Sequence, residues 1–249
     1  MTTIALQPIP EHPALFIPSL HMIVISDLHI GIEHELQEHG VHASDLTPLM
    51  IQDIIALCTQ YHPTDLLILG DLKHSIPSTP YLEQRKVKSL LTTLQEYVQV
   101  HIVPGNHDGF LKRFVPSGIT VYSSSGVTIE NYAFIHGHRW PNESHLKTDH
   151  LIIAHSHPTV ALKDRLQYTT YEPCWIKAKP ISKKIIERYP EYNPDITFLF
   201  IPAFNPISGG LAVNEEGVMG PLSKITDIDH ANIYLLDGTF LGKVQDVCD

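Results

Sequence analysis

The 249-residue sequence has few cysteines, too little basic charge to balance its acids, and no apolar run long enough to span a membrane. Its three cysteines, Cys58, Cys174 and Cys248, are widely spaced and form no CxxC pair, so we expect reduced thiols rather than disulfide bonds. The first 18 residues include Glu11 and four prolines, and they lack the basic start and apolar run of a secretion signal. These features predict a cytoplasmic protein that makes no contact with a membrane.

Acidic residues outnumber basic residues by 27 to 17, and the formal net charge is -10. The surface as a whole should therefore repel nucleic acid, although a local basic patch could still bind it. Hydrophobic residues make up 43% and charged residues 18% of the chain, the balance of a folded globular protein. The length suits one large α/β domain and no repeat divides it, so we predict a single domain over residues 1–249.

Five short apolar runs organise the first two thirds of the chain. They occupy residues 22–25, 66–69, 101–103, 132–135 and 151–154. Each is apolar on consecutive positions, which is typical of a strand buried on both faces. Thr47-Pro48 and Thr79-Pro80 resemble helix starts, with threonine as the N-cap and proline in the first turn. The first three runs and these two helices predict a βαβαβ unit with parallel strands.

Later residues are more typical of hairpins. Residues 127–129 and 132–134 flank a two-residue turn at Glu130-Asn131, and residues 233–236 and 239–241 flank Asp237-Gly238. The segment 162–194 has mixed charge and no clear period, so the sequence predicts no element there.

Polar motifs follow all five apolar runs. They are Asp27-Leu28-His29, Gly70-Asp71-Leu72-Lys73-His74, Gly105-Asn106-His107-Asp108, His136-Gly137-His138 and His155-Ser156-His157. Any one of them alone is more often a turn than a site. Because the loops at the carboxyl ends of strands in an open α/β sheet meet at one crevice, their conjunction indicates a shared site.

The ligand types limit the metal. Carboxylate, imidazole and amide groups without thiolate suit Mn, Fe, Zn or similar ions. Seven such groups exceed the four ligands of one tetrahedral zinc ion, but they fit two ions that share a bridging carboxylate. Two ions roughly 3.5–4 Å apart can clamp a phosphoryl group and activate a water molecule.

The order of these motifs resembles the calcineurin-like metallophosphoesterase superfamily over about residues 22–158. Within it, the chain is similar to the archaeal and bacterial predicted phosphoesterases that include the ligase-associated PdeM type. The Gly-Asp-Leu-Lys-His string, Cys174-Trp175 and the segment 202–210 carry this narrower likeness, which extends to about residue 224. The resemblance implies an α/β sandwich of two mixed β-sheets flanked by helices.

The resemblance also implies roles for individual residues. Asp27, His29 and His157 would hold one metal ion, Asn106, His136 and His155 a second, and Asp71 would bridge the two ions. Manganese is the expected metal, with Fe, Zn, Ni and Mg as alternatives. His107 would bind the phosphate or protonate the leaving oxygen, and Asp108 would orient its loop or that histidine.

Two positions depart from the superfamily pattern. Ala154 replaces the usual glycine, and His74 stands where phosphoprotein phosphatases carry an aspartate, which disfavours a protein-phosphatase activity. His74, Arg139 and Trp140 are candidates for substrate contacts, the last two by binding a phosphate and stacking a base. An exposed arginine and a half-buried tryptophan with no such role are the simpler interpretation of that pair.

The expected activity is hydrolysis of phosphate esters by in-line attack of a metal-bridging hydroxide, with diesters in nucleotides or nucleic acid as the first choice. One alternative is a phosphomonoesterase that acts on a small metabolite. A second is a metal-stabilised binding subunit of a DNA-repair or RNA-processing assembly.

Overall fold

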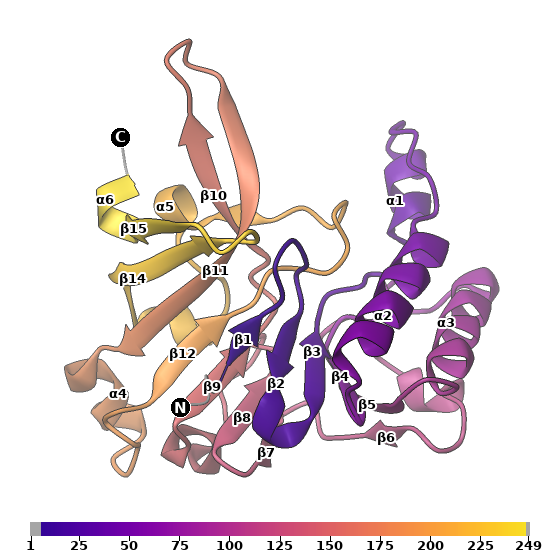
Figure 1. Cartoon of the computed structure of the whole chain (residues 1–249), viewed down its shortest axis with the longest axis horizontal. Coiled ribbons are helices and arrows are strands. Elements are labelled where there is room, and N and C mark those ends of the chain that lie inside the picture. The colour runs from indigo at the N-terminus through magenta and orange to yellow at the C-terminus, as the bar shows by residue number, and fades with distance from the viewer. Residues whose placement is uncertain (1–5, 248–249) are drawn as a thin grey trace.

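The computed structural model describes residues 6–247 and contains two β-sheets packed face to face, with helices on their outer surfaces (Figure 1). The first sheet has the strand order β1-β2-β3-β4-β5-β6. These strands are β1 (Gln7–Pro8), β2 (Leu15–Ile17), β3 (Met22–Ile25), β4 (Asp65–Leu69), β5 (Gln99–Val103) and β6 (Thr120–Val121). Strands β3, β4 and β5 are parallel, as the predicted βαβαβ unit requires.

The second sheet is larger and also mixed. Its main strand order is β13-β10-β11-β12-β9-β8-β7. Strand β14 lies off this order and pairs with both β11 and β15. The strands are β7 (Val127–Ile129), β8 (Tyr132–Ile135), β9 (His150–Ile153), β10 (Pro158–Lys163), β11 (Thr169–Pro180), β12 (Thr197–Phe200), β13 (Leu211–Ala212), β14 (Thr226–Leu235) and β15 (Phe240–Lys243). Strands β8, β9 and β12 are parallel to one another. The predicted fold class, a sandwich of two mixed sheets flanked by helices, is confirmed.

A layer of apolar side chains fills the space between the sheets. Val24 and Leu69 from the first sheet meet Phe134, Ile152 and Trp175 from the second, and all five are at most 1% exposed. Burial of each such side chain contributes about 1.5–3 kcal/mol to folding. Because β3, β8 and β9 are buried along nearly their whole length, these strands are covered on both faces, as predicted.

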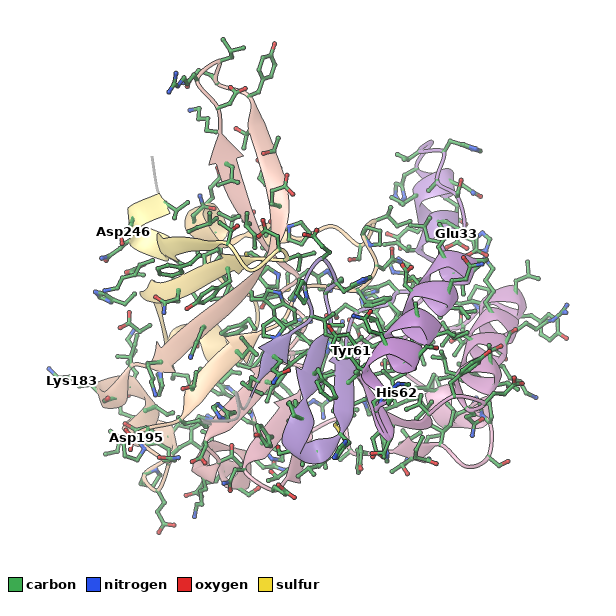
Figure 2. The ribbon with its side chains drawn as sticks, viewed as in Figure 1. Glu33, Tyr61, His62, Lys183, Asp195 and Asp246 are labelled. Carbon is green, nitrogen blue, oxygen red and sulfur yellow. The ribbon has the colours of Figure 1, made fainter. Side chains whose placement is uncertain are left out.

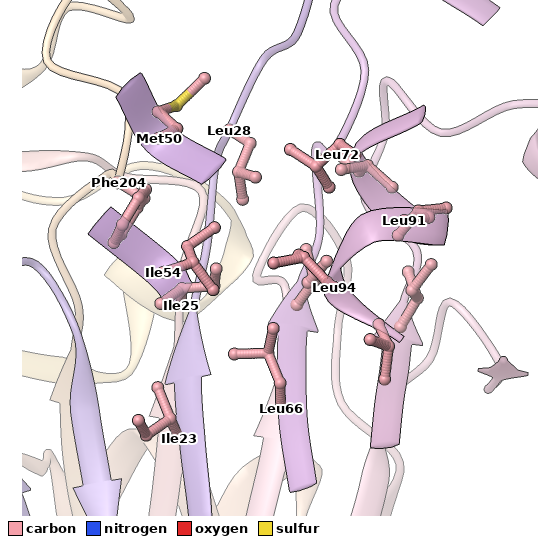
Figure 3. Packing of buried hydrophobic residues seen from close by; sticks show 14 of the residues in the cluster. Ile23, Ile25, Leu28, Met50, Ile54, Leu66, Leu72, Leu91, Leu94 and Phe204 are labelled. Carbon is pink, nitrogen blue, oxygen red and sulfur yellow. The ribbon is translucent and has the colours of Figure 1, made fainter. Parts of the chain in front are cut away.

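Helices α2 (Thr47–Tyr61) and α3 (Tyr81–Leu94) cover the outer face of the first sheet. Figure 3 shows Ile54 of α2 and Leu91 of α3 packed over the apolar strand residues. Shorter helices lie over the outer face of the second sheet. They are α4 (Ser182–Arg188), α5 (Val213–Glu216) and α6 (Val244–Val247), together with the 3-10 turns η3 (Glu143–Lys147) and η4 (Pro221–Lys224).

The two predicted helices exist, but the predicted threonine caps are wrong by one residue. Thr47 already belongs to α2, because the carboxylate of Asp45 accepts its N–H at 2.9 Å and Leu46 occupies the cap position. At α3 the cap position is held by Pro80 rather than Thr79. Proline has no N–H that would be left unsatisfied at a helix start, so it is tolerated there.

The segment for which the sequence predicted no element forms most of β10–β11 and α4. The β10–β11 hairpin and α1 (Ile32–Glu38) both project from the body on the same side (Figure 1). Figure 2 shows the side chains at the tip of the hairpin standing clear of the rest. Glu33, labelled on α1, is buried and paired with Lys86 of α3. Tyr171 on β11, for example, is 58% exposed. Because the outer half of the hairpin is not buried, it lacks the run of apolar residues from which a strand could be predicted.

The other local predictions can be checked within residues 6–247. Both hairpins are present, with β7 paired to β8 and β14 paired to β15. Cys58 and Cys174 are free and buried, whereas Cys248 lies outside the described residues. No helix in this part of the chain is both long enough and apolar enough to cross a bilayer.

Candidate metal centre

Each predicted ligand follows a strand whose carboxyl end faces the same crevice. Asp27 and His29 follow β3, Asp71 follows β4 and Asn106 follows β5 in the first sheet, while His136 follows β8 and His155 and His157 follow β9 in the second. The structure brings all seven residues together. Five of them line or border a hollow of about 360 Å³ between the two sheets: His29, Asp71, Asn106, His155 and His157.

One group of ligand atoms comes from Asp27, His29 and His157, which lie within 4.8 Å of one another. Oδ1 of Asp27 lies 3.2 Å from Nε2 of His157. Nε2 of His157 lies 3.4 Å from Nε2 of His29. Two imidazole nitrogens and a carboxylate oxygen thus point at a common position, as predicted for the first ion.

A second group comes from Asp71, His136 and His155, again within 4.8 Å of one another. Nε2 of His136 lies 3.1 Å from Oδ2 of Asp71 and 3.2 Å from Oδ1 of Asn106. These are the residues predicted for the second ion. Oδ2 of Asp71 also lies 3.8 Å from Nε2 of His29, which belongs to the first group. One carboxylate therefore reaches both groups.

Five of the seven candidate ligands have left-handed backbone conformations, with φ between 40° and 71°. They are Asp27, His29, Asp71, His155 and His157. A residue with a β-carbon pays about 1–2 kcal/mol for this conformation. Such strain concentrates at functional sites, where surrounding structure holds the backbone in place. Here each left-handed residue turns its side chain sharply away from the end of its strand and into the crevice.

Two of the imidazoles are held in the neutral form that can coordinate a metal. Burial lowers the pKa of His29 to about 3, despite the neighbouring charges of Asp27 and Asp71. Burial also lowers the pKa of His155 to about 4, and the charge of His136 acts in the same direction. Neutral imidazole is the ligand form, so neither residue has a proton to release before it binds an ion.

The other two imidazoles are paired with the buried carboxylates. Burial lowers the pKa of His136, but the hydrogen bond and charge of Asp71 outweigh it and raise the pKa to about 9. Burial likewise opposes the charge of Asp27 at His157, whose pKa is raised overall. Burial favours the neutral acid at Asp71, yet His136 holds the pKa of that carboxyl below its ordinary value. Buried negative charge at these two aspartates thus attracts cations.

The donor set fits two divalent ions. Asp27 is fully buried, and its Oδ1 accepts no hydrogen bond although His157 is near. A buried carboxylate oxygen without such a partner is costly unless a cation satisfies it. Each group offers one carboxylate with neutral imidazole nitrogen, and Asp71 stands between the groups. Oxygen and imidazole ligands without thiolate match Mn, Fe, Zn and similar ions.

The predicted catalytic residues lie beside these groups. The ring of His107 is 4.9 Å from that of His29, and its side chain lines the same hollow. Its Nδ1 donates to the carbonyl of His74, and its backbone N–H donates to Oδ1 of Asp71 at 2.8 Å. Asp108 is buried and accepts the backbone N–H groups of Gly105 and Lys73. It thereby ties the loop after β5 to the loop after β4.

The predicted substrate-contact residues divide into two groups. His74 lines the hollow, stacks on His107 at 5.4 Å and reaches Oε2 of Glu35 at 2.6 Å. Arg139 is exposed, and its Nε donates to His138 at 2.9 Å. Trp140, by contrast, packs against Tyr189 and lies under the guanidinium of Arg188, 4.3 Å from its carbon. Within the described chain, Trp140 is held by the second sheet's outer layer rather than by the hollow.

Sequence reasoning missed two residues that shape the loops. Glu83 on α3 is fully buried and accepts the N–H groups of His74 and Ser75, which fixes the loop after β4. Asn205 is buried, and its side-chain amide donates to the carbonyl of Leu28 at 2.8 Å, which fixes the loop after β3. In the sequence, the only indications of these two roles were that Glu83 is an acid in the first turn of a helix and that Asn205 precedes a proline after a buried strand.

Gly105 is required by the close approach of two loops. A β-carbon there would overlap Oδ1 of Asp71 and lie 2.6 Å from the backbone nitrogen of the same residue. We therefore expect Gly105→Ala to displace Asp71 and to weaken metal binding by about 10–100-fold, the usual cost of disturbing a ligand's support. Titration of the chelated protein with Mn²⁺, followed by calorimetry, measures this change.

Gly109 provides a matched control in the same loop. A β-carbon at Gly109 would meet no heavy atom within 4 Å, and its φ is not left-handed. Gly109→Ala should therefore leave the affinity for Mn²⁺ within a factor of about two. Equal affinities in the two variants would show that Asp71 does not depend on the loop after β5.

Comparisons with known proteins bear on the fold and on the family. The chain shares its fold with the crystal structure of nuclease MPE from Pseudomonas putida, at 21% identity and a TM-score of 0.57, covering 93% of this chain and 97% of that one. The E. coli phosphoesterase Yfce is 16% identical, with a TM-score of 0.41 and coverage of 89% and 97%. No curated protein matches the sequence. Residues 20–210 match the family model of the calcineurin-like phosphoesterases. The chain therefore belongs to the calcineurin-like phosphoesterase family.

Proposed function

We propose that this phosphoesterase hydrolyses phosphodiesters, in nucleotides or nucleic acid, at a centre of two divalent metal ions. The observation that carries the proposal is the position of Asp71, whose Oδ2 lies 3.1 Å from His136 and 3.8 Å from His29. A carboxylate shared between two groups of imidazoles is the arrangement that two ions with one bridging ligand need, and His136 and His157 would each lose a proton on binding an ion.

Asp27, His29 and His157 would hold one ion, and Asn106, His136 and His155 the other, with Asp71 on both. When bound, such ions polarise a phosphoryl oxygen and lower the pKa of a water molecule, with Mn²⁺ as the first choice of metal. Fe, Zn, Ni and Mg ions accept the same donors to different degrees.

His107 supplies a proton carrier beside the ligands. Because its Nδ1 donates to the carbonyl of His74, Nε2 is the nitrogen left to exchange a proton with a bound ester. Protonated at Nε2, the ring would donate to the departing alkoxide and then recover its proton from water. Asp108 positions this residue by holding the loop at Gly105 and Lys73.

The composition of the hollow favours a diester over a monoester. Among the described residues that line it there is neither a lysine nor an arginine. A monoester carries nearly two negative charges at neutral pH, and proteins commonly neutralise the second charge with such a cation. A diester carries one charge, which two bound ions and His107 can neutralise without further help.

A substrate panel tests the proposal. Protein loaded with Mn²⁺ should hydrolyse bis-p-nitrophenyl phosphate at least about tenfold faster than p-nitrophenyl phosphate, and should act on cyclic nucleotides or oligonucleotides. Because the fold is shared with a nuclease, single- and double-stranded oligonucleotides belong in the panel. Faster hydrolysis of the monoester would replace the proposal with a phosphomonoesterase. No hydrolysis by fully loaded protein would favour a metal-stabilised binding subunit.

A further inference from the structure

One further hollow adjoins that of the candidate metal centre, and a second adjoins the first. One, of about 650 Å³, begins at Asn106 and ends at Arg113 of η2 (Leu111–Arg113). The other, of about 630 Å³, lies between η2 and α3, and it also includes Arg113. Asn106 lines both the hollow of the metal centre and the first of these two, and Arg113 lines both of these two. The three hollows thus adjoin one another in a row, which we treat as one path.

This path has the charge opposite to that of the whole chain. We call it the basic groove, defined by its five cationic side chains, Arg85, Lys88, Lys112, Arg113 and Arg139. Five of the 17 lysines and arginines thus face two adjacent hollows. The only carboxylate among the described lining residues is Asp108, which is buried and already accepts two backbone N–H groups.

The cations of the basic groove are available to a ligand. All five are exposed, and in residues 6–247 no ion pair joins any of them to a carboxylate. Lys86, on the same helix α3, is by contrast paired with both Glu33 and Asp45. Unpaired positive charge gathered along a groove of a protein with a net charge of -10 favours a polyanion.

Exposed aromatic rings accompany the cations. Phe110 is 62% exposed with the guanidinium of Arg113 over its face, 4.4 Å from the ring centre. Tyr81 is 71% exposed, and the guanidinium of Arg85 lies 6.0 Å from its ring. Aromatic faces next to arginines accept unpaired bases, whereas a duplex keeps its bases stacked inside.

We propose that the basic groove binds a single-stranded nucleic acid whose phosphodiester backbone continues into the metal centre. The phosphates would lie along the five cations, and bases would stack on Phe110 and Tyr81. This inference rests on the proposed phosphodiesterase activity and assigns it a polymeric substrate. A nucleotide or other small diester would occupy the metal centre without reaching η2 or α3.

The test removes charge far from the metal ligands. The groove variant carries Arg85→Gln, Lys88→Gln and Arg113→Gln, and the control variant carries Lys163→Gln, Lys183→Gln and Lys184→Gln. The three control lysines are exposed and lie on β10 and α4. Their replacement changes the net charge of the protein by the same amount as the groove variant does. Fluorescence anisotropy measures the Kd of a labelled 20-mer of oligo(dT) and of oligo(U) in EDTA at several salt concentrations.

The wild type and the control variant should show a log Kd against log salt slope of about 3.5 for five phosphate contacts on a single strand, and the groove variant a slope shallower by about 2. Its Kd should rise at least tenfold. Phe110→Ala should raise the Kd about 5–150-fold through lost stacking. The Kd values of oligo(dT) and oligo(U) should both rise in these variants, since DNA and RNA share the phosphodiester backbone and the base faces.

Hydrolysis separates this inference from the proposed function. With Mn²⁺, the groove variant should keep the rate on bis-p-nitrophenyl phosphate and raise KM for the oligonucleotide at least tenfold. Equal oligonucleotide affinity in the groove and control variants would overturn the inference while leaving diester hydrolysis intact. Tighter binding of duplex than of single strand would also overturn it. Loss of binding in the groove variant without any hydrolysis by wild type would instead support the groove and reject the phosphodiesterase.

Discussion

Asp71→Asn is expected to empty both metal sites together and to lower kcat/KM by about 10³-fold or more. The amide keeps an oxygen for the N–H of His107 but loses the charge that Asp71 presents to His136 and His29. Several kcal/mol of charge stabilisation would be lost, and each 1.4 kcal/mol is a factor of ten. Mass spectrometry under native conditions should find about two Mn ions in the wild type and fewer than one in the variant.

His29→Ala serves as the contrast, because His29 reaches the first group more closely than the second, and it should leave about one ion. Asp65→Asn is the matched control for the lost charge. Asp65 starts the same strand β4, far from the crevice, and pairs with His101 at 2.7 Å. This variant should retain about two ions and wild-type activity. A single ion in fully loaded wild type would contradict the dinuclear centre.

His107→Ala and His107→Gln are expected to lower kcat by about 10²–10⁴ while both ions remain bound. His107 lies beside His29 but belongs to neither group of proposed ligands, so its removal leaves both coordination sets complete. The loss should be largest for esters whose leaving alkoxide is strongly basic, because these need a proton most. For p-nitrophenolate, which departs as a weak base, the loss should be smaller.

Single-turnover rates on a series of substituted phenyl and alkyl diesters measure this dependence. A steeper dependence of rate on leaving-group pKa in the variant than in the wild type is the signature of a lost proton donor. Equal losses across the series would instead make His107 a phosphate-binding group. Loss of one metal ion from the variant would mean that His107 is itself a ligand, together with His29 and His74, whose nitrogens also lie within 4.8 Å.

The strands and the gathering of the ligands could be predicted because both depend on local pattern. The run at residues 22–25 is apolar on every position, which is typical of a strand buried on both faces. Parallel strands then bring Asp27 and Asp71 to the same edge without further information. That the edge of a second sheet would supply His136 and His155 followed from the family resemblance and not from the pattern alone.

Features set by individual side-chain contacts could not be predicted in the same way. The cap of α2 depends on Asp45, whose side chain accepts the N–H of Thr47 two residues later. Trp140 follows the motif at β8, but its surroundings depend on Tyr189 and Arg188, about 50 residues away. The basic groove combines side chains of α3, η2 and the loop after β8. In the sequence these cations are far apart, and the negative net charge of the whole chain gives no sign that they form a basic groove.

Both proposed ion sites draw ligands from each of the two sheets. His29 and His157 are 128 residues apart, and Asp71 and His136 come from different sheets as well. An ion at either site would therefore act as a noncovalent cross-link that closes a long loop, as a disulfide does. Without ions, the apolar layer between the sheets and hydrogen bonds such as that from Asn205 to Leu28 join the two halves. Metal supply would then govern how cooperatively the halves unfold, and a metal-starved cell would hold a looser protein as well as an inactive one.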